Sequence, residues 1–233
     1  MAEKMKNTAP LALAVGVLAF LYVELTANFT FHWVTEGNLG NGLALPADFH
    51  LVIPAGFISW GLFFALGADV KAFRSVSLNC LIGSAAAMIL FIFVAVVKGL
   101  PDFWSISLGV GLLAFLLITL SGGLAWINVP VVFGAFAANV MWWIATGLDG
   151  WAKHGGGTGK SLAALAKPAT AGTGAFGGVL STPYGWVAVD VAATLLLGAV
   201  FGMLSVRLAG MMTPTRAKPH APADPEAVGS PAA

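Results

Sequence analysis

Charged side chains are scarce in this chain of 233 residues. Asp, Glu, Lys and Arg make up 9% of it, whereas hydrophobic residues make up 58%. Soluble domains average about 25% charged residues. The formal net charge is only +1, which gives no basis for attracting nucleic acid. Nucleic-acid binding needs Lys and Arg clustered on one face. We therefore expect an integral membrane protein whose main partner is the lipid bilayer, with no nucleic-acid partner.

Cysteine and the common catalytic motifs are scarce as well. The single cysteine, Cys80, lies within an apolar segment and is typical of a small buried side chain. No nucleophile elbow or catalytic triad is visible. Residues 154–161 read HGGGTGKS, but His154 stands where a phosphate-binding loop needs its first glycine, and no strand precedes it. We expect no enzyme activity, no cofactor, no metal and no bound nucleotide.

Long apolar segments make up most of the sequence. About 20 apolar residues cross the ~30 Å of hydrocarbon in a bilayer as a helix. The first segment follows Lys4 and Lys6 but lacks a convincing signal-peptide cleavage site, so we interpret it as a helix. The sequence predicts an all-α bundle of six transmembrane helices within residues 1–212. The predicted spans are 10–30, 49–68, 75–97, 104–120, 127–147 and 185–208.

The basic residues predict an orientation, because they accumulate on the cytoplasmic side. With six spans, seven of the eleven fall on the side of both termini and four on the other. The seven are Lys4, Lys6, Lys71, Arg74, Arg207, Arg216 and Lys218; the four are Lys98, Lys153, Lys160 and Lys167. Both termini are thus predicted to be cytoplasmic. Residues 213–233, rich in Pro and Ala, are expected to form a disordered tail.

Two halves of the sequence resemble each other. Residues 13–21 read LAVGVLAFL and residues 108–116 read LGVGLLAFL, and the Ile53-Pro54 pair has a counterpart in Val129-Pro130. Either the chain is a 3+3 repeat, or the likeness is a chance match of apolar sequence. Three spans per unit would make the repeat inverted, with a substrate site between the halves. That alignment pairs Glu24 with Thr119, and Asn79 with Asp190.

Glu24 and Asp190 are the only acidic side chains well inside predicted spans, and no Lys or Arg lies well inside to neutralise them. Each lies about six residues, or roughly 9 Å, from the outer end of its span. Carboxylates at such depth usually face a protein interior or a water-filled cavity. They predict a cation or proton site, or acceptors that line a polar pore. Protonated carboxyls that only stabilise helix packing are the alternative.

Other polar residues extend this candidate site. Asn28 and His32 follow Glu24 at intervals of four residues, and His50 lies near the outer end of the second span. Asn79 and Thr119 would occupy the inner half. A set of His32, His50 and a carboxylate is also a metal-ligand combination, although interfacial histidines in contact with water are the simpler interpretation.

Small residues mark helix contacts. Gly198 and Gly202 form a GxxxG pattern, and Gly134 begins a weaker one. Such patterns let helix backbones approach closely, either within the bundle or between subunits. We expect a homo-oligomer that uses the Gly198 and Gly202 face or the Gly134 face.

Three segments carry a resemblance to a known family. They are residues 56–68 (GFISWGLFFALGA), 129–137 (VPVVFGAFA) and 197–203 (LGAVFGM). In this order they resemble the bacterial inner-membrane family DUF1097, whose function is unknown. The resemblance implies a small multi-helix protein of the bacterial cytoplasmic membrane and carries no catalytic or binding residues. The long loop at 148–184 departs from the family's compact form.

We expect a small-solute or ion channel or transporter with an intramembrane acidic site. The alternative is a non-transporting structural or accessory subunit of a membrane assembly.

Overall fold

The computed structural model describes residues 2–30, 46, 48–101, 103–146, 148–151 and 183–213, with side chains from residue 8 onward. These residues form an all-helical structure without strands. The helices are α1 (Ala2–Asn28), α2 (Ile53–Ala65), α3 (Val70–Val96), α4 (Trp104–Gly123), α5 (Val129–Ala145) and α7 (Tyr184–Met212). His32, the loop at 152–182 and the tail at 214–233 lie outside the described residues.

Four helices are long and apolar enough to cross a membrane: residues Thr8–Asn28 of α1, and α3, α4 and α7. The other two, α2 and α5, are apolar but have only 13 and 17 residues. The prediction of an all-α, membrane-type bundle is therefore confirmed, with four candidate spans and two shorter helices among the described residues.

Local sequence explains where two helices differ from their predicted bounds. We predicted a second span at 49–68, but α2 begins only at Ile53, because Pro54 in its first turn favours a helix start. It ends before Gly67 and Ala68, which both have positive φ. The next helix, α3, begins at Val70 rather than 75, because the side chain of Asp69 accepts the Ala72 N–H as an N-cap.

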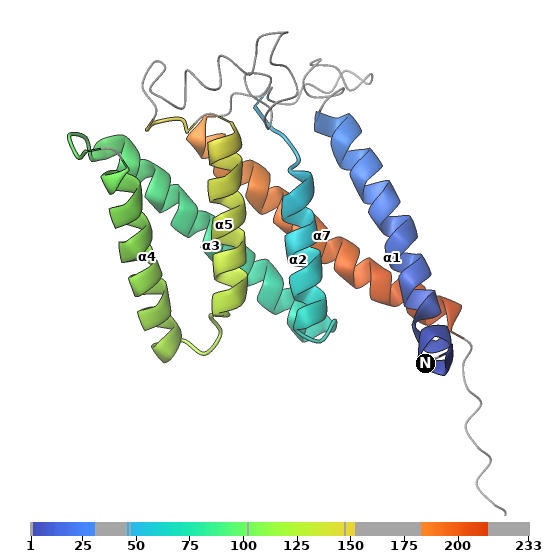
Figure 1. The fold of residues 1–233 in the computed structure, drawn as a ribbon. Coiled ribbons are helices and arrows are strands. Elements are labelled where there is room, and N and C mark those ends of the chain that lie inside the picture. The colour runs from blue at the N-terminus through green and yellow to red at the C-terminus, as the bar shows by residue number, and fades with distance from the viewer. Residues whose placement is uncertain are drawn as a thin grey trace, which may run out of the picture.

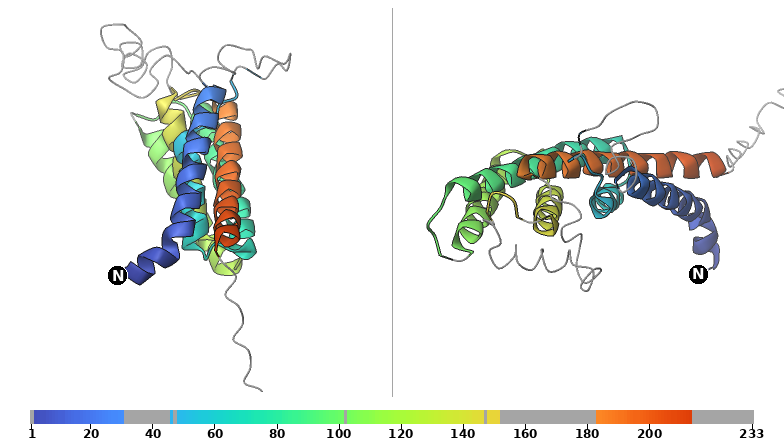
Figure 2. Two further views of the ribbon diagram at one scale, coloured as in Figure 1. Left: turned by 90° about the vertical axis from the view of Figure 1, so that its right-hand side faces the viewer. Right: turned by 90° about the horizontal axis from the view of Figure 1, so that it is seen from above.

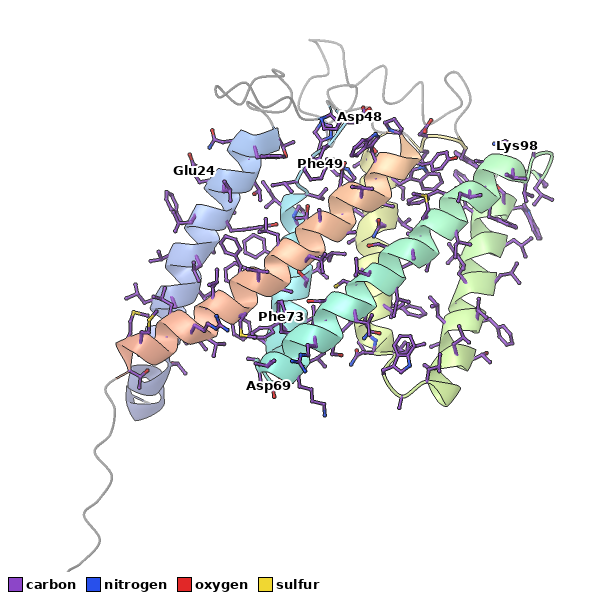
Figure 3. The ribbon with its side chains drawn as sticks, turned by 180° about the vertical axis from the view of Figure 1, so that it is seen from behind. Glu24, Asp48, Phe49, Asp69, Phe73 and Lys98 are labelled. Carbon is purple, nitrogen blue, oxygen red and sulfur yellow. The ribbon has the colours of Figure 1, made fainter. Side chains whose placement is uncertain are left out.

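The helices form two layers (Figures 1 and 2). One layer holds α3 and α7, and the other holds α1, α2, α5 and α4 in that order; from above, the two layers form a curved slab. Successive helices run in opposite directions, so α1 begins and α7 ends at the same face. We call it the terminal face. Asp69 lies at the terminal face and Lys98 at the opposite one, which we call the Lys98 face (Figure 3).

Helix contacts show a regular relation between the two halves of the chain. The neighbours of α7 are α1, α2, α5 and α3, and the neighbours of α3 are α4, α5, α2 and α7. Exchanging α1 with α4, α2 with α5, and α3 with α7 reproduces the same set of neighbours. The contacts α1 to α2 and α4 to α5 also exchange, and α2 to α5 maps onto itself.

Glycines allow the closest contacts between the layers. A Cβ at Gly198 would overlap the Gly56 carbonyl and the Ser59 hydroxyl of α2, and a Cβ at Gly202 would overlap Phe63. A Cβ at Gly134 would lie 3.2 Å from Leu62. The glycine faces predicted to join two copies of the chain are therefore used inside one copy, because α2 packs against them.

Candidate functional site

A short non-helical segment, residues 49–52, precedes α2; we call it the α2 leader. Val52 is the N-cap of α2 and has extended backbone angles, and Pro54 in the first turn favours a helix start there. The backbone N–H groups of this leader lack helical partners, whereas the Val52 carbonyl already accepts the Ala55 N–H. Within a membrane they need other partners, because unsatisfied groups in hydrocarbon cost several kcal/mol each.

Side chains of α7 supply two of these partners. The backbone N–H of His50 donates to Asp190 Oδ1 at 3.1 Å, and the N–H of Val52 donates to Thr194 Oγ1 at 3.0 Å. The Thr194 hydroxyl in turn donates to the Asp190 carbonyl at 2.7 Å. Asp190 and Thr194 lie one turn apart and are fully buried, so one face of α7 holds the leader.

Tyr22 of α1 and Thr30, two residues beyond α1, hold the other edge of the leader and the first residue of α2. The Leu51 N–H donates to Thr30 Oγ1 at 2.9 Å, and the Thr30 hydroxyl lies 3.1 Å from the Leu51 carbonyl. The Tyr22 hydroxyl donates to the Ile53 carbonyl at 3.0 Å. The leader thus lies between α1 and α7, with polar side chains on both sides.

Asp190 and His50 form the ionisable part of the site. His50 Nδ1 lies 3.7 Å from Asp190 Oδ2, and both side chains are buried. Neither of these two atoms has a hydrogen-bond partner among the described residues. The Trp142 side chain of α5 also lies beside the Asp190 carboxyl. The result is a buried acid that lies beside an imidazole and an indole.

A matching arrangement precedes α5. Residues 126–128 are non-helical, Pro130 lies in the first turn of α5, and we call these three residues the α5 leader. The Asn128 N–H donates to Asn79 Oδ1 at 2.7 Å, and Asn79 Nδ2 donates to the Trp126 carbonyl at 3.1 Å. Asn79 belongs to α3 and is fully buried. It holds the α5 leader as Asp190 holds the α2 leader.

Glu24 does not join this site. It is exposed on α1, and its carboxylate accepts a hydrogen bond from Asn28 Nδ2 at 2.9 Å. The buried face of α1 carries Tyr22, and a residue two positions further along lies about 200° around the helix from it. The expected pairing of Glu24 with Asp190 is therefore not found.

The remaining predicted residues are also separate from Asp190. Thr119 is exposed, and its hydroxyl donates to the Phe115 carbonyl within α4. Among the described residues, Asn28 donates to the carboxylate and the carbonyl of Glu24 within α1. Of the predicted set, the structure brings His50 to Asp190 and places Asn79 in the equivalent position of the other half.

The sequence reasoning missed Thr30 and Trp142. A signal for them exists in the Ile53-Pro54 and Val129-Pro130 pairs. A helix that starts at a proline leaves the preceding residues non-helical, and in a membrane those residues require polar partners from neighbouring helices. Among the described residues, no three His, Cys, Asp or Glu side chains gather closely enough to hold a metal ion.

The family model described as "Protein of unknown function (DUF1097)" matches residues 12–210. The chain belongs to this family. No curated protein and no solved structure matches it. Asp190, His50 and Asn79 all lie within the matched residues.

Proposed function

We propose that this DUF1097 protein is a small-solute or ion channel or transporter of the bacterial cytoplasmic membrane, built as a 3+3 inverted repeat. One observation carries the proposal. Two short helices, each opened by a proline, occupy corresponding positions in the two halves, and each has a non-helical leader held by a buried polar side chain. Interrupted helices in corresponding positions of two halves are typical of transporter substrate sites.

The leaders support six membrane passes. A helix of 13 residues rises about 20 Å, and the four residues of the α2 leader add about 13 Å when extended. The sum, roughly 33 Å, matches the ~30 Å of a hydrocarbon core. The α2 leader and α2 together are therefore long enough for one pass, as are the α5 leader and α5.

The ends of the short helices support the repeat. Ala68 and Leu148 follow α2 and α5 with left-handed φ values of 57° and 56°, and each is followed by an aspartate. Asp69 accepts the N–H of Ala72 in α3, and Asp149 accepts the N–H of Tyr184, the first residue of α7. In each unit, the aspartate after the left-handed residue therefore accepts a backbone N–H in the first turn of the third helix. The second unit has residues 150–183 inserted after the cap.

The repeat is interlocked. The α2 leader in the first unit is held by Asp190 in the second, and the α5 leader in the second unit is held by Asn79 in the first. Movement of one unit relative to the other would therefore strain the hydrogen bonds that hold both leaders. This coupling is what alternating access between two repeats requires.

The orientation is part of the proposal. Lys71 and Arg74 lie in the first turns of α3, which begins at the terminal face beside Asp69, and Arg207 lies in the last turns of α7, which ends at that face. Lys98 lies at the opposite face (Figure 3). Since basic residues accumulate on the cytoplasmic side, the terminal face is cytoplasmic and Asp190 lies in the periplasmic half.

Flux through reconstituted liposomes tests the function. The wild type should pass at least one of protons, small cations, weak acids or urea-like amides above empty vesicles. Asp190→Asn should change the rate or the pH dependence of that flux, since it removes the charge beside His50. Glu24→Gln is the matched control and should leave flux unchanged, because Glu24 is outside the bundle. Absence of any flux in the wild type contradicts the proposal.

A non-transporting subunit is the second candidate, and the exposed Glu24 favours it. Its carboxylate lies among exposed apolar side chains of α1, including Phe20 and Leu21. Insertion scales put the cost of an acidic residue at the bilayer centre at roughly 2.5–3.5 kcal/mol, and a helix of a second copy or another protein would lower it. Purification under mild conditions would favour this function if a partner copurifies in stoichiometric amount and the Glu24→Gln variant releases that partner.

A further inference from the structure

A second buried polar pair links α3 to α5. Asn139 Nδ2 donates to Ser84 Oγ at 3.0 Å and to the Ala135 carbonyl at 2.8 Å. Asn139 is fully buried and Ser84 nearly so. Because the Ala135 carbonyl can only accept, it fixes the amide orientation, and Asn139 Oδ1 faces away. That oxygen has no partner among the described residues.

This pair lies between the two leader sites. Asn139 is eleven residues beyond Asn128, or about 16 Å above the α5 leader, and one turn before Trp142, which lies beside Asp190. Ser84 is five residues beyond Asn79 on α3. We use the term polar seam for the set that runs from the terminal face towards the Lys98 face: Asn79, Ser84, Asn139, Trp142, Asp190 and His50.

Among the described residues, the seam holds a buried acceptor without a hydrogen-bond partner, Asn139 Oδ1. Further along the seam, the Asp190 carboxyl lies beside His50 and Trp142, with His50 Nδ1 3.7 Å from Asp190 Oδ2. A buried polar atom left unpaired costs about 1–3 kcal/mol. Such atoms are ordinarily satisfied by bound water or solute.

Resting on the proposed function, we propose that the polar seam is the transport path and that its substrate is a small uncharged solute that donates hydrogen bonds, such as urea or a short amide. The unpaired acceptor Asn139 Oδ1 and the carboxylate of Asp190 select for N–H or O–H donors. Ser84 and Asn139 offer only neutral dipoles in the middle of the path, so a permanent ion would lose its hydration there without a countercharge.

The helices are in closest contact across the seam at Gly83 of α3. A Cβ at Gly83 would overlap the Val132 carbonyl and the Ala135 side chain, so α3 and α5 touch between Asn79 and Ser84. Opening the path requires α5 to move away from α3 there. The α5 leader, held by Asn79 directly below this contact, is where such a movement would begin.

Thiol labelling tests the path without relying on flux. In a Cys80→Ala background, Ser84→Cys should react with a small, uncharged and hydrophilic methanethiosulfonate reagent at least tenfold faster than Ser59→Cys. Ser59 is the matched control, a fully buried serine that donates to the Gly56 carbonyl at the α2 to α7 contact. Urea should slow the reaction at Ser84→Cys. Equal rates at both positions in monodisperse protein overturn the path.

Flux measurements test the substrate class. Asn139→Leu should lower urea flux at least tenfold, whereas Asn28→Leu, which removes an amide from the outer part of α1, should not. If the wild type passes ions but no urea or amide, the substrate assignment is wrong and the proposed function stands. If the wild type passes no solute, the proposed function fails and the substrate assignment falls with it. Unchanged urea flux in Asn139→Leu also overturns the assignment.

Discussion

Single glycines decide how closely the two layers of the bundle approach. Gly198 faces the Gly56 carbonyl, so a methyl group there meets backbone that cannot rotate away. Overpacking of this kind typically costs about 1–3 kcal/mol. We expect Gly198→Ala to lower the unfolding temperature in detergent, measured by loss of the monodisperse peak after heating.

Gly16 provides the control for that substitution. It is exposed on α1, and a Cβ there has nothing within 4 Å. Gly16→Ala should leave stability unchanged or raise it by about 0.5–1 kcal/mol, the helix-interior advantage of alanine over glycine. Equal melting of the two variants would show that α7 can shift off α2 without cost.

Residue spacing in the sequence identified polar positions but not their direction. Asp190, His50 and Asn79 were predicted as site residues, and the structure buries all three. Glu24 was predicted to face the interior and does not. The reason is that α1 carries apolar side chains on all sides, so the spacing of Glu24 and Asn28 shows that they share a face without showing which face is inside.

At the scale of elements, the two leaders are held by different chemical groups for the same purpose. Asp190 accepts a backbone N–H in one half, and Asn79 does so in the other. Asp190→Asn should therefore fold as well as the wild type, because an amide oxygen can accept the His50 N–H. Asp190→Ala should be destabilised by about 1–3 kcal/mol, since the N–H is left unpaired. Thermal unfolding of the two variants measures the difference.

Asn79→Ala is the companion variant in the other half. It removes an acceptor from Asn128 and a donor to Trp126, so its loss of stability should match or exceed that of Asp190→Ala. If Asp190→Asn melts as early as Asp190→Ala, the charge and not the hydrogen bond holds the α2 leader.

Six apolar segments were visible in the sequence, and six helices lie near them. The leaders were not visible as such, because residues 49–52 are as apolar as the helix they precede, apart from His50. Hydropathy indicates whether a segment suits an apolar environment, but it does not indicate whether the backbone of that segment is helical. Only the prolines at 54 and 130 distinguished the short helices from the long ones.

At the scale of the whole molecule, the weak sequence likeness between the halves now has structural counterparts. The predicted alignment pairs Asn79 with Asp190, and in the structure each of these two residues accepts a backbone N–H from a leader. The predicted alignment of Glu24 with Thr119 places together two exposed residues of the peripheral helices α1 and α4. The helices had to be packed before this relation was visible, because it lies in which helices touch rather than in shared side chains.

Membrane topology distinguishes six passes from four. With six, the connection between α2 and α3 at Gly67 and the connection between α4 and α5 at Ala125 are cytoplasmic, and the turn after Lys98 is periplasmic. If only the four long helices cross, α2 and α5 do not change sides. The Gly67 connection then becomes periplasmic and the Lys98 turn cytoplasmic.

Reporter fusions measure which topology holds. With six passes, alkaline phosphatase inserted after Lys98 should be active, and the same enzyme inserted at Gly67 should be inactive. A green fluorescent protein fused after Thr213 should fluoresce in either case, which makes it the control for insertion and expression. The reverse activities at Gly67 and Lys98 would contradict the six-pass inverted repeat and the transport path derived from it.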